Sequence, residues 1–149
     1  MSELPLDELL QLVQQAGEAT LEYWRGELNV QRKDDDSPVT AADLAAHRIL
    51  AAGLPQLLGI PVLSEEACDI PLEQRRSWQR WWLVDPLDGT KEFIANSPEY
   101  TVNVALVEQG RVVFGVVGVP ASGQVYYGGH GQGAGLLDQD ERKQIQVSA

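Results

Sequence analysis

The chain has 149 residues, with 22 Asp and Glu against 11 Lys and Arg, and a formal net charge of −11. The length suits a single domain, and 44% hydrophobic residues are typical of ordinary globular proteins. This negative charge argues against a nucleic-acid duplex or an anionic membrane surface as the main partner. An anionic small molecule remains compatible, because divalent cations reverse the charge of a carboxylate-lined site.

The single cysteine, Cys68, allows no internal disulfide, and the acidic N-terminus lacks the apolar segment of a signal peptide. No stretch reaches the ~20 apolar residues that a membrane-spanning helix needs. We therefore expect the chain in the reducing cytoplasm. A peripheral position on the inner face of the cell membrane is compatible with the sequence but not required by it.

Two amphipathic helices are predicted first. Apolar residues recur every three or four positions from residue 6 to about residue 24. The second helix is expected to start at Thr40, its N-cap, with Asp43 in a shortened capping box, and to run to about Leu58. Pro55 is expected to interrupt this helix or end it early.

Strands follow the two helices. Residues 61–64 predict a short strand, and the apolar run 81–84 predicts a central strand, buried on both faces, that ends at Asp85. The β-rich runs 101–107 and 111–119 are joined by a hairpin turn. Further segments are a strand at 124–127, a glycine-rich loop at 128–135 and the start of a strand in 143–147. This order predicts an α+β fold, with two N-terminal helices packed on a mainly antiparallel sheet.

The segment Asp85-Pro86-Leu87-Asp88-Gly89-Thr90 carries the clearest chemical signal. A tight turn over 85–88 would place both carboxylates and the Leu87 carbonyl on one side of the chain. These hard oxygen donors suit Mg²⁺, whereas two adjacent anions repel each other without a cation. A short helix over 90–94 would point the backbone N–H groups of Gly89 and Thr90 at an anion. The segment therefore predicts a metal-assisted phosphate-ester site.

Other interpretations of these motifs compete with the metal site. A local Asp-Pro turn, capped by Asp88, needs no metal at all. Haloacid-dehalogenase-type phosphatases also carry an acidic D-G-T motif, but a single residue separates their two aspartates, whereas Pro86 and Leu87 intervene here. The glycine pattern at 129–134 matches a dinucleotide-binding motif without the acidic ribose ligand ~20 residues later, so a glycine-rich hairpin is favoured.

The segment 85–90 resembles the metal-binding signature of the inositol-monophosphatase-like phosphatases, which depend on Mg²⁺ and are sensitive to lithium. Residues 64–66 resemble the family's upstream acidic motif, and residues 37–43 resemble its loop-to-helix motif. Within that superfamily, residues 83–94 are most similar to the bacterial 3'(2'),5'-bisphosphate nucleotidases. Inositol monophosphatases typically have Asn where this chain has Glu92. The resemblance implies the N-terminal half of an α/β/α/β sandwich.

The resemblance also implies a role for each matching residue. Glu65 and Asp85 would share one Mg²⁺ with the Leu87 carbonyl, and Asp85 and Asp88 would hold a second. The catalytic set would be Asp43, Glu65 and Thr90, in which Thr90, paired with Asp43, orients and deprotonates the attacking water. The phosphate would contact the metals and a binding set made of Glu65, Leu87, Asp88, Gly89 and Thr90. Lys33 and Asp35 match a loop that helps to hold a third, weaker metal ion.

The implied activity is removal of a phosphate from adenosine 3',5'-bisphosphate, a by-product of sulfate assimilation. The expected partner is thus a small-molecule phosphate ester, and a homodimer is compatible. The family's second half, with a Trp-Asp motif that completes the second metal, has no counterpart in this sequence. We therefore expect an N-terminal metal-binding phosphatase domain over 1–149 that binds Mg²⁺ weakly and turns over slowly or not at all. Two alternatives stay open: an inositol monophosphatase-type sugar phosphatase, and a catalytically incomplete metal-binding fragment.

Overall fold

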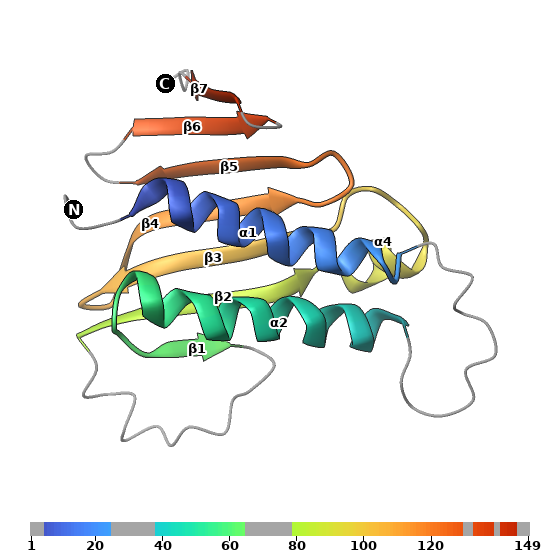
Figure 1. Ribbon diagram of the computed structural model, residues 1–149, viewed down its shortest axis with the longest axis horizontal. Helices are drawn as coiled ribbons and strands as arrows, with labels where there is room; N and C mark the ends of the chain where they lie inside the picture. Colours follow the sequence, from blue (N-terminus) through green and yellow to red (C-terminus); the bar gives the residue numbers. More distant parts are fainter. Residues whose placement is uncertain (1–4, 25–37, 65–78, 130–132, 139–140, 146–149) are drawn as a thin grey trace.

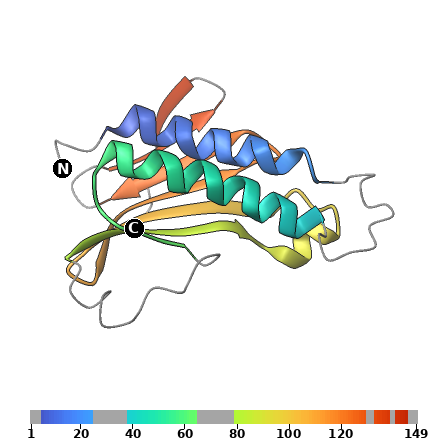
Figure 2. The same cartoon turned by 60° about the horizontal axis from the view of Figure 1, so that its bottom comes forward.

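The computed structural model describes residues 5–24, 38–64, 79–129, 133–138 and 141–145, with only the backbone described for 38, 39 and 141–145. In this part of the chain, helices α1 (Leu6–Leu21) and α2 (Pro38–Leu57) lie together on one face of a sheet (Figures 1 and 2). A short helix, α4 (Thr90–Ile94), follows the second strand. The strands are β1 (Val62–Ser64), β2 (Arg80–Asp88), β3 (Thr101–Glu108), β4 (Arg111–Val119), β5 (Gln124–Gly129), β6 (Gly133–Asp138) and β7 (Glu141–Ile145).

The described strands form one seven-stranded sheet in chain order, β1 to β7. β1 and β2 run parallel, and each later pair is antiparallel, so the predicted α+β fold with a mainly antiparallel sheet is confirmed. No described helix is both long and apolar enough to cross a membrane.

Side chains alternate along β2 between a covered and an uncovered face. Trp82 and Val84 are buried beneath the helices, whereas Leu83, between them, is 37% exposed. On the same uncovered face, Val117 and Tyr126 are 39% and 40% exposed. The prediction that β2 is buried on both faces is therefore wrong for this structure, because the two long described helices cover the same face of the sheet (Figure 2).

The helix boundaries differ from the predicted ones. α2 begins at Pro38, so Thr40 lies inside the helix and is not its N-cap. A proline suits a first turn, where its missing N–H would have no helical acceptor. Pro55 lies within the last turn, where one lost hydrogen bond is tolerated, and the N–H of Leu58 still reaches the Leu54 carbonyl at 3.2 Å. α1 ends at Leu21, and residues 22–24 form a turn.

The hairpin between β3 and β4 is confirmed, with a two-residue turn at Gln109 and Gly110. Both residues have positive φ, 52° and 80°, which matches the right-handed twist of the paired strands. The glycine-rich segment is not the long loop that was predicted, because Gly128 pairs with Ala134 and Gly129 with Gly133. It is a glycine-rich hairpin between β5 and β6. β7 overlaps the strand predicted to start in 143–147.

The main core lies between the two helices and the covered face of the sheet. Burying one large apolar side chain stabilises the fold by ~1.5–3 kcal/mol, so this layer is the chief source of stability. Its largest fully buried side chains are Leu9, Leu10, Val13, Leu50, Leu54, Trp82, Val84, Val102, Leu106, Phe114 and Val116.

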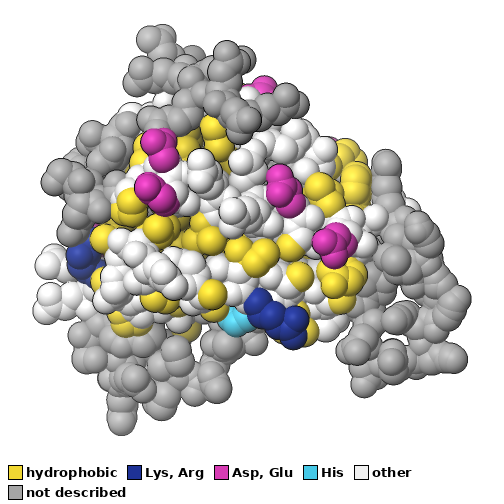
Figure 3. Space-filling view, in the orientation of Figure 1, with side chains coloured by type: hydrophobic (Ala, Val, Ile, Leu, Met, Phe, Trp, Pro, Cys, Tyr) yellow, Lys and Arg dark blue, Asp and Glu magenta, His cyan; other side chains and the backbone are white. Residues whose placement is uncertain are grey.

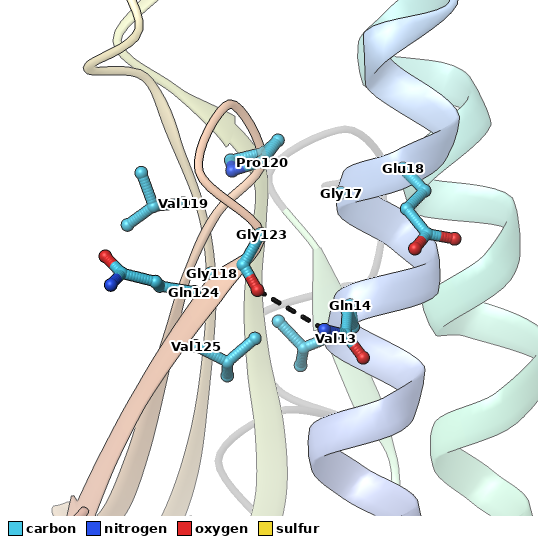
Figure 4. A pocket seen from close by; sticks show the side chains of 10 residues that line it. All are labelled: Val13, Gln14, Gly17, Glu18, Gly118, Val119, Pro120, Gly123, Gln124 and Val125. Carbon is cyan, nitrogen blue, oxygen red and sulfur yellow. Dashed lines mark hydrogen bonds between the residues drawn. The ribbon is translucent and has the colours of Figure 1, made fainter. Parts of the chain in front are cut away.

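α1 packs very closely on the turn between β4 and β5. A Cβ placed on Gly118 would lie 2.9 Å from Val13 Cγ1, and one on Gly17 would lie 3.2 Å from Pro120 Cγ. Gln14 Nε2 donates a hydrogen bond to the Gly123 carbonyl at 3.3 Å (Figure 4). The remaining cavity of about 20 Å³ leaves room for little more than one water molecule. Small residues on both sides therefore set the distance between α1 and the sheet.

A second buried cluster lies beside the main core and consists of Ala42, Leu87, Phe93 and Tyr100, with Tyr23 and Trp24 packed against it. The rings of Phe93 and Tyr100 meet edge to face, with centroids 4.9 Å apart. Thr20 Oγ1 lies 2.8 Å from the Tyr100 hydroxyl and donates to the Gly17 carbonyl at 2.6 Å, so Tyr100 is the donor to Thr20. We call this group the aromatic cluster, and it joins α1, α2, β2, α4 and the start of β3.

Gly118→Ala is expected to destabilise the fold by ~1–3 kcal/mol, because the added methyl group overpacks the contact with Val13. Gly115→Ala in the same strand is the matched control, since nothing lies within 4 Å of a Cβ at Gly115. Urea unfolding of both variants measures the difference. Equal free energies of unfolding would show that α1 does not need this close approach.

Tyr100→Phe is expected to remove a pH-dependent part of the stability. Burial raises the pKa of Tyr100 above its ordinary 10.0, with the Thr20 hydrogen bond as a smaller opposing effect. The stabilisation from this raised pKa is fully present below pH ~10 and is lost as the pH rises toward the folded-state pKa. The free energy of unfolding of the wild type should therefore exceed that of the variant by about 1 kcal/mol at neutral pH. This difference should shrink above pH ~10.

Urea unfolding at several pH values measures that margin. Tyr126→Phe, which removes an exposed hydroxyl, is the control for effects of the phenol itself. A margin for Tyr100→Phe that stays constant up to pH ~11 would contradict the account of a buried neutral phenol.

Candidate metal centre

Three elements that carry predicted site residues meet at one end of the sheet. The carboxyl end of β2, the N-terminal end of α2 and the short helix α4 lie there together (Figure 1). Because β1 and β2 are parallel, Ser64 lies opposite Val84, the residue before Asp85. His47 Nδ1 lies 3.0 Å from Ser64 Oγ, which ties α2 to the end of β1. His47 is thus packed against the end of β1.

The two aspartates of the motif are brought together by a bulge. In β2, Asp85 pairs with Asn103 and Asp88 pairs with Thr101, so three steps along β2 match two steps along β3. Asn103 Nδ2 donates to Asp88 Oδ2 at 3.2 Å. The predicted tight turn over 85–88, and the predicted end of the strand at Asp85, are therefore wrong. The chain stays in the sheet and re-aims its side chains through the bulge.

Buried neighbours fix the backbone of the bulge. Pro86 is buried, and Leu87 is 5% exposed and packs in the aromatic cluster. Asp85 is half-buried and Asp88 is exposed. The apolar residues between the aspartates therefore anchor the segment, and the carboxylates stay at the surface.

Gly89 links the bulge to α4 and has φ of +98°. A Cβ at this position would also lie 3.2 Å from Tyr100 Cα, so glycine is required by both conformation and space. The predicted short helix is confirmed as α4, and the N–H of Phe93 donates to the Gly89 carbonyl at 2.9 Å. Thr90, the first residue of α4, is exposed.

Asp43 lies in α2, half-buried, with Oδ1 shielded from solvent. The preceding residue, Ala42, packs with Phe93 of α4 in the aromatic cluster. α2 and α4 are therefore in contact, which places Asp43 and Thr90 on neighbouring elements. Their direct pairing stays a prediction.

Glu65, Lys33 and Asp35 lie outside the described residues, as does the rest of the aspartate loop at 34–36. Sequence reasoning missed two residues of this region, Asn103 and Tyr100. The signal for Asn103 is a single amide side chain within an apolar β-run, where Asn is disfavoured. Its meaning depends on the pairing of β3 with β2.

The donor atoms at this end of the sheet fit Mg²⁺. Asp85 and Asp88 supply carboxylates, and Asn103 Oδ1 is a buried acceptor that receives no hydrogen bond within the described structure. Hard oxygen donors are the ligands that Mg²⁺ prefers. Within the described ranges, no three His, Cys, Asp or Glu side chains gather as a complete metal site. The described residues thus provide part of a coordination sphere.

The helix face of the molecule and the uncovered face of the sheet present different side chains. On the helix face, acidic side chains are spread among apolar and uncharged ones (Figure 3). On the uncovered face of the sheet, Asp85 and Asn103 line one end of a hollow of about 240 Å³. The hollow continues over apolar residues that include Leu83 and Val117. A ligand at Asp85 has access from this side.

Comparisons with known proteins match this chain to one family. Residues 4–149 match the model of the inositol monophosphatase family. The chain is 51% identical over 146 residues to the 3'(2'),5'-bisphosphate nucleotidase CysQ of Salmonella typhimurium, covering 95% of this chain and 58% of the relative. The corresponding CysQ of Haemophilus influenzae is 36% identical over 128 residues, covering 85% of this chain and 48% of the relative.

Solved structures share the fold. The crystal structure of CysQ from Bacteroides thetaiotaomicron superposes with a TM-score of 0.83 at 33% identity, covering 96% of this chain and 58% of that one. An inositol monophosphatase from Zymomonas mobilis gives a TM-score of 0.74 at 28% identity, covering 96% and 53%. The chain thus spans about half the length of the proteins it matches. By the match over 4–149, the chain belongs to the inositol monophosphatase family.

Proposed function

We propose that this chain carries the metal- and phosphate-binding part of a Mg²⁺-dependent phosphomonoesterase that acts on adenosine 3',5'-bisphosphate. The observation that carries the proposal is the bulged end of β2, which directs Asp85 and Asp88 to the neighbourhood of Asn103, next to α4. Asp85 and Asp88 put two negative charges at one end of β2, and a bound cation offsets like charges that lie near each other.

In this proposal, Asp85, Asp88 and the Leu87 carbonyl hold Mg²⁺, with Glu65 as a further ligand. When bound, the cations lower the pKa of a coordinated water toward neutrality and offset the charge of the phosphate. Thr90 orients the attacking water and takes up its proton while passing the hydroxyl proton to Asp43. The amides of Gly89 and Thr90 bind the phosphate, and Lys33 and Asp35 help to hold a third ion.

The substrate part of the proposal is supported by the relatives. Proteins named 3'(2'),5'-bisphosphate nucleotidase are up to 51% identical to this chain among those compared. The inositol monophosphatase from Zymomonas mobilis is 28% identical. An inositol phosphate is therefore the competing substrate, and it differs from the nucleotide in lacking a base and a second phosphate. Lithium sensitivity, a cytoplasmic location and a role in sulfur metabolism belong to the same proposal.

The test separates metal binding from turnover. Titration calorimetry on the 149-residue chain measures Mg²⁺ binding, which we expect to be weak and to be lost in Asp85→Asn. Asp138→Asn is the matched control, because it makes the same chemical change at the end of β6, four strands away from β2. No Mg²⁺ binding by the wild type, or equal binding by Asp85→Asn, would refute the metal site.

Turnover is measured in a chimera, in which this chain replaces the matching 146 residues of the Salmonella relative. Phosphate release should require Mg²⁺, fall with lithium and be faster from adenosine 3',5'-bisphosphate than from inositol 1-phosphate. Asp85→Asn should reduce it by about 100-fold or more, since the metal supplies several kcal/mol of transition-state stabilisation. Equal or faster release from inositol 1-phosphate would favour the sugar phosphatase. Metal binding without release from either ester would favour a non-catalytic domain.

A further inference from the structure

Asn103 is the residue that contacts the motif from the neighbouring strand. It pairs in register with Asp85, and its Nδ2 donates to Asp88 Oδ2 at 3.2 Å. The bulge in β2 makes both relations possible. It fits the three residue steps from Asp85 to Asp88 opposite only two residue steps of β3, so both aspartates stay near Asn103. One amide side chain is thus adjacent to both aspartates.

The Asp88 carboxylate determines which way the Asn103 amide group points. Its NH₂ group must face Asp88, because an amide oxygen there would repel the carboxylate. Oδ1 is consequently directed away from Asp88 Oδ2, and it is buried without a hydrogen-bond donor among the described residues. Leaving a buried acceptor unsatisfied costs ~1–3 kcal/mol, so this oxygen is suited to receive a donor that arrives with a ligand.

Asn103 is uncharged, and this affects the electrostatics of the two aspartates beside it. A carboxylate at this position would add a third negative charge beside Asp85 and Asp88 and would increase their repulsion. The amide instead donates to one carboxylate without cancelling its charge, so that carboxylate remains able to bind a cation. Some residues hydrogen-bond to a metal ligand without touching the metal themselves. Removing such a residue typically lowers metal affinity by about 10–100-fold.

We propose that Asn103 is a positioning residue of the metal centre. Its amide N–H holds the Asp88 carboxylate in place, and its Oδ1 accepts a hydrogen bond from a water molecule in the filled site. This inference rests on the proposed function, because it presupposes that Asp85 and Asp88 bind a cation.

The test uses Mn²⁺ alone as the probe, since it takes the same oxygen ligands as Mg²⁺ and its free concentration is read by electron paramagnetic resonance. Asn103→Leu removes both hydrogen-bonding groups at similar volume. The matched control is Gln124→Met, because Gln124 Nε2 donates to Asp138 Oδ2 at 3.3 Å across β5 and β6. Both variants lose one cross-strand bond between an amide and a carboxylate.

We expect Asn103→Leu to raise the Kd for Mn²⁺ by about 10–100-fold, and Gln124→Met to leave it unchanged. In metal-free buffer, the unfolding midpoints of the two variants should shift by similar amounts, because each loses one comparable hydrogen bond. Asn103→Ser, whose side chain is too short to reach Asp88, should weaken Mn²⁺ binding in the same way. It replaces Asn103→Leu in the test if the leucine variant does not fold.

Two results would overturn the inference in distinguishable ways. If the wild type binds Mn²⁺, Asp85→Asn abolishes that binding and both Asn103 variants bind as tightly as the wild type, then only the role of Asn103 is refuted. If the wild type itself binds no Mn²⁺, the proposed metal centre is refuted and the role of Asn103 falls with it.

Discussion

The β-bulge between Asp85 and Asp88 is the constraint on which the rest of the candidate site depends. It places Asp85 opposite Asn103 and Asp88 opposite Thr101, with Asp88 Oδ2 accepting from the Asn103 amide, and the buried residues between the aspartates anchor the segment. Two like charges held close are unfavourable unless something compensates them. The amide of Asn103, which donates to Asp88 Oδ2, is one group that offsets this charge, and in the proposed function a bound cation adds to it.

The aromatic cluster explains how a surface site of this kind is kept rigid. Leu87 of the bulge, Ala42 of α2, Phe93 of α4 and Tyr100 just before β3 belong to one buried cluster, and the rings of Phe93 and Tyr100 meet edge to face. The hydroxyl groups of Tyr100 and Thr20 extend the cluster to α1. Residues far apart in sequence are therefore positioned by one apolar unit, and the proposed metal site would need such support to hold its ligands.

Local chemistry decides which features were predictable from the sequence. The turn at Gln109 and Gly110, the helix α4 and the face of α1 follow from short patterns, and the structure confirms them. The glycine pattern at 129–134 favours a hairpin, and the structure confirms it. The strand residues of this hairpin are harder to predict, because glycines carry no side-chain alternation from which a strand can be recognised. Thr40 was predicted to be an N-cap because a capping pattern does not show that the helix already starts at Pro38.

The site itself was only partly predictable, for a similar reason. The motif over 85–90 predicts a metal site from the sequence alone, and that assignment stays a prediction. The contribution of Asn103 arises from strand register, which no local pattern encodes. The burial of β2 was overestimated because an apolar run does not reveal whether one face or two will be covered.

The most direct test of the central claim is a crystal of this chain soaked in MnCl₂, with anomalous diffraction data collected to locate manganese. The account predicts an anomalous peak between the carboxylates of Asp85 and Asp88, within reach of the Leu87 carbonyl. Manganese bound only at other carboxylates, such as Asp7, Glu8 or Asp138, with no peak at the end of β2, would contradict it.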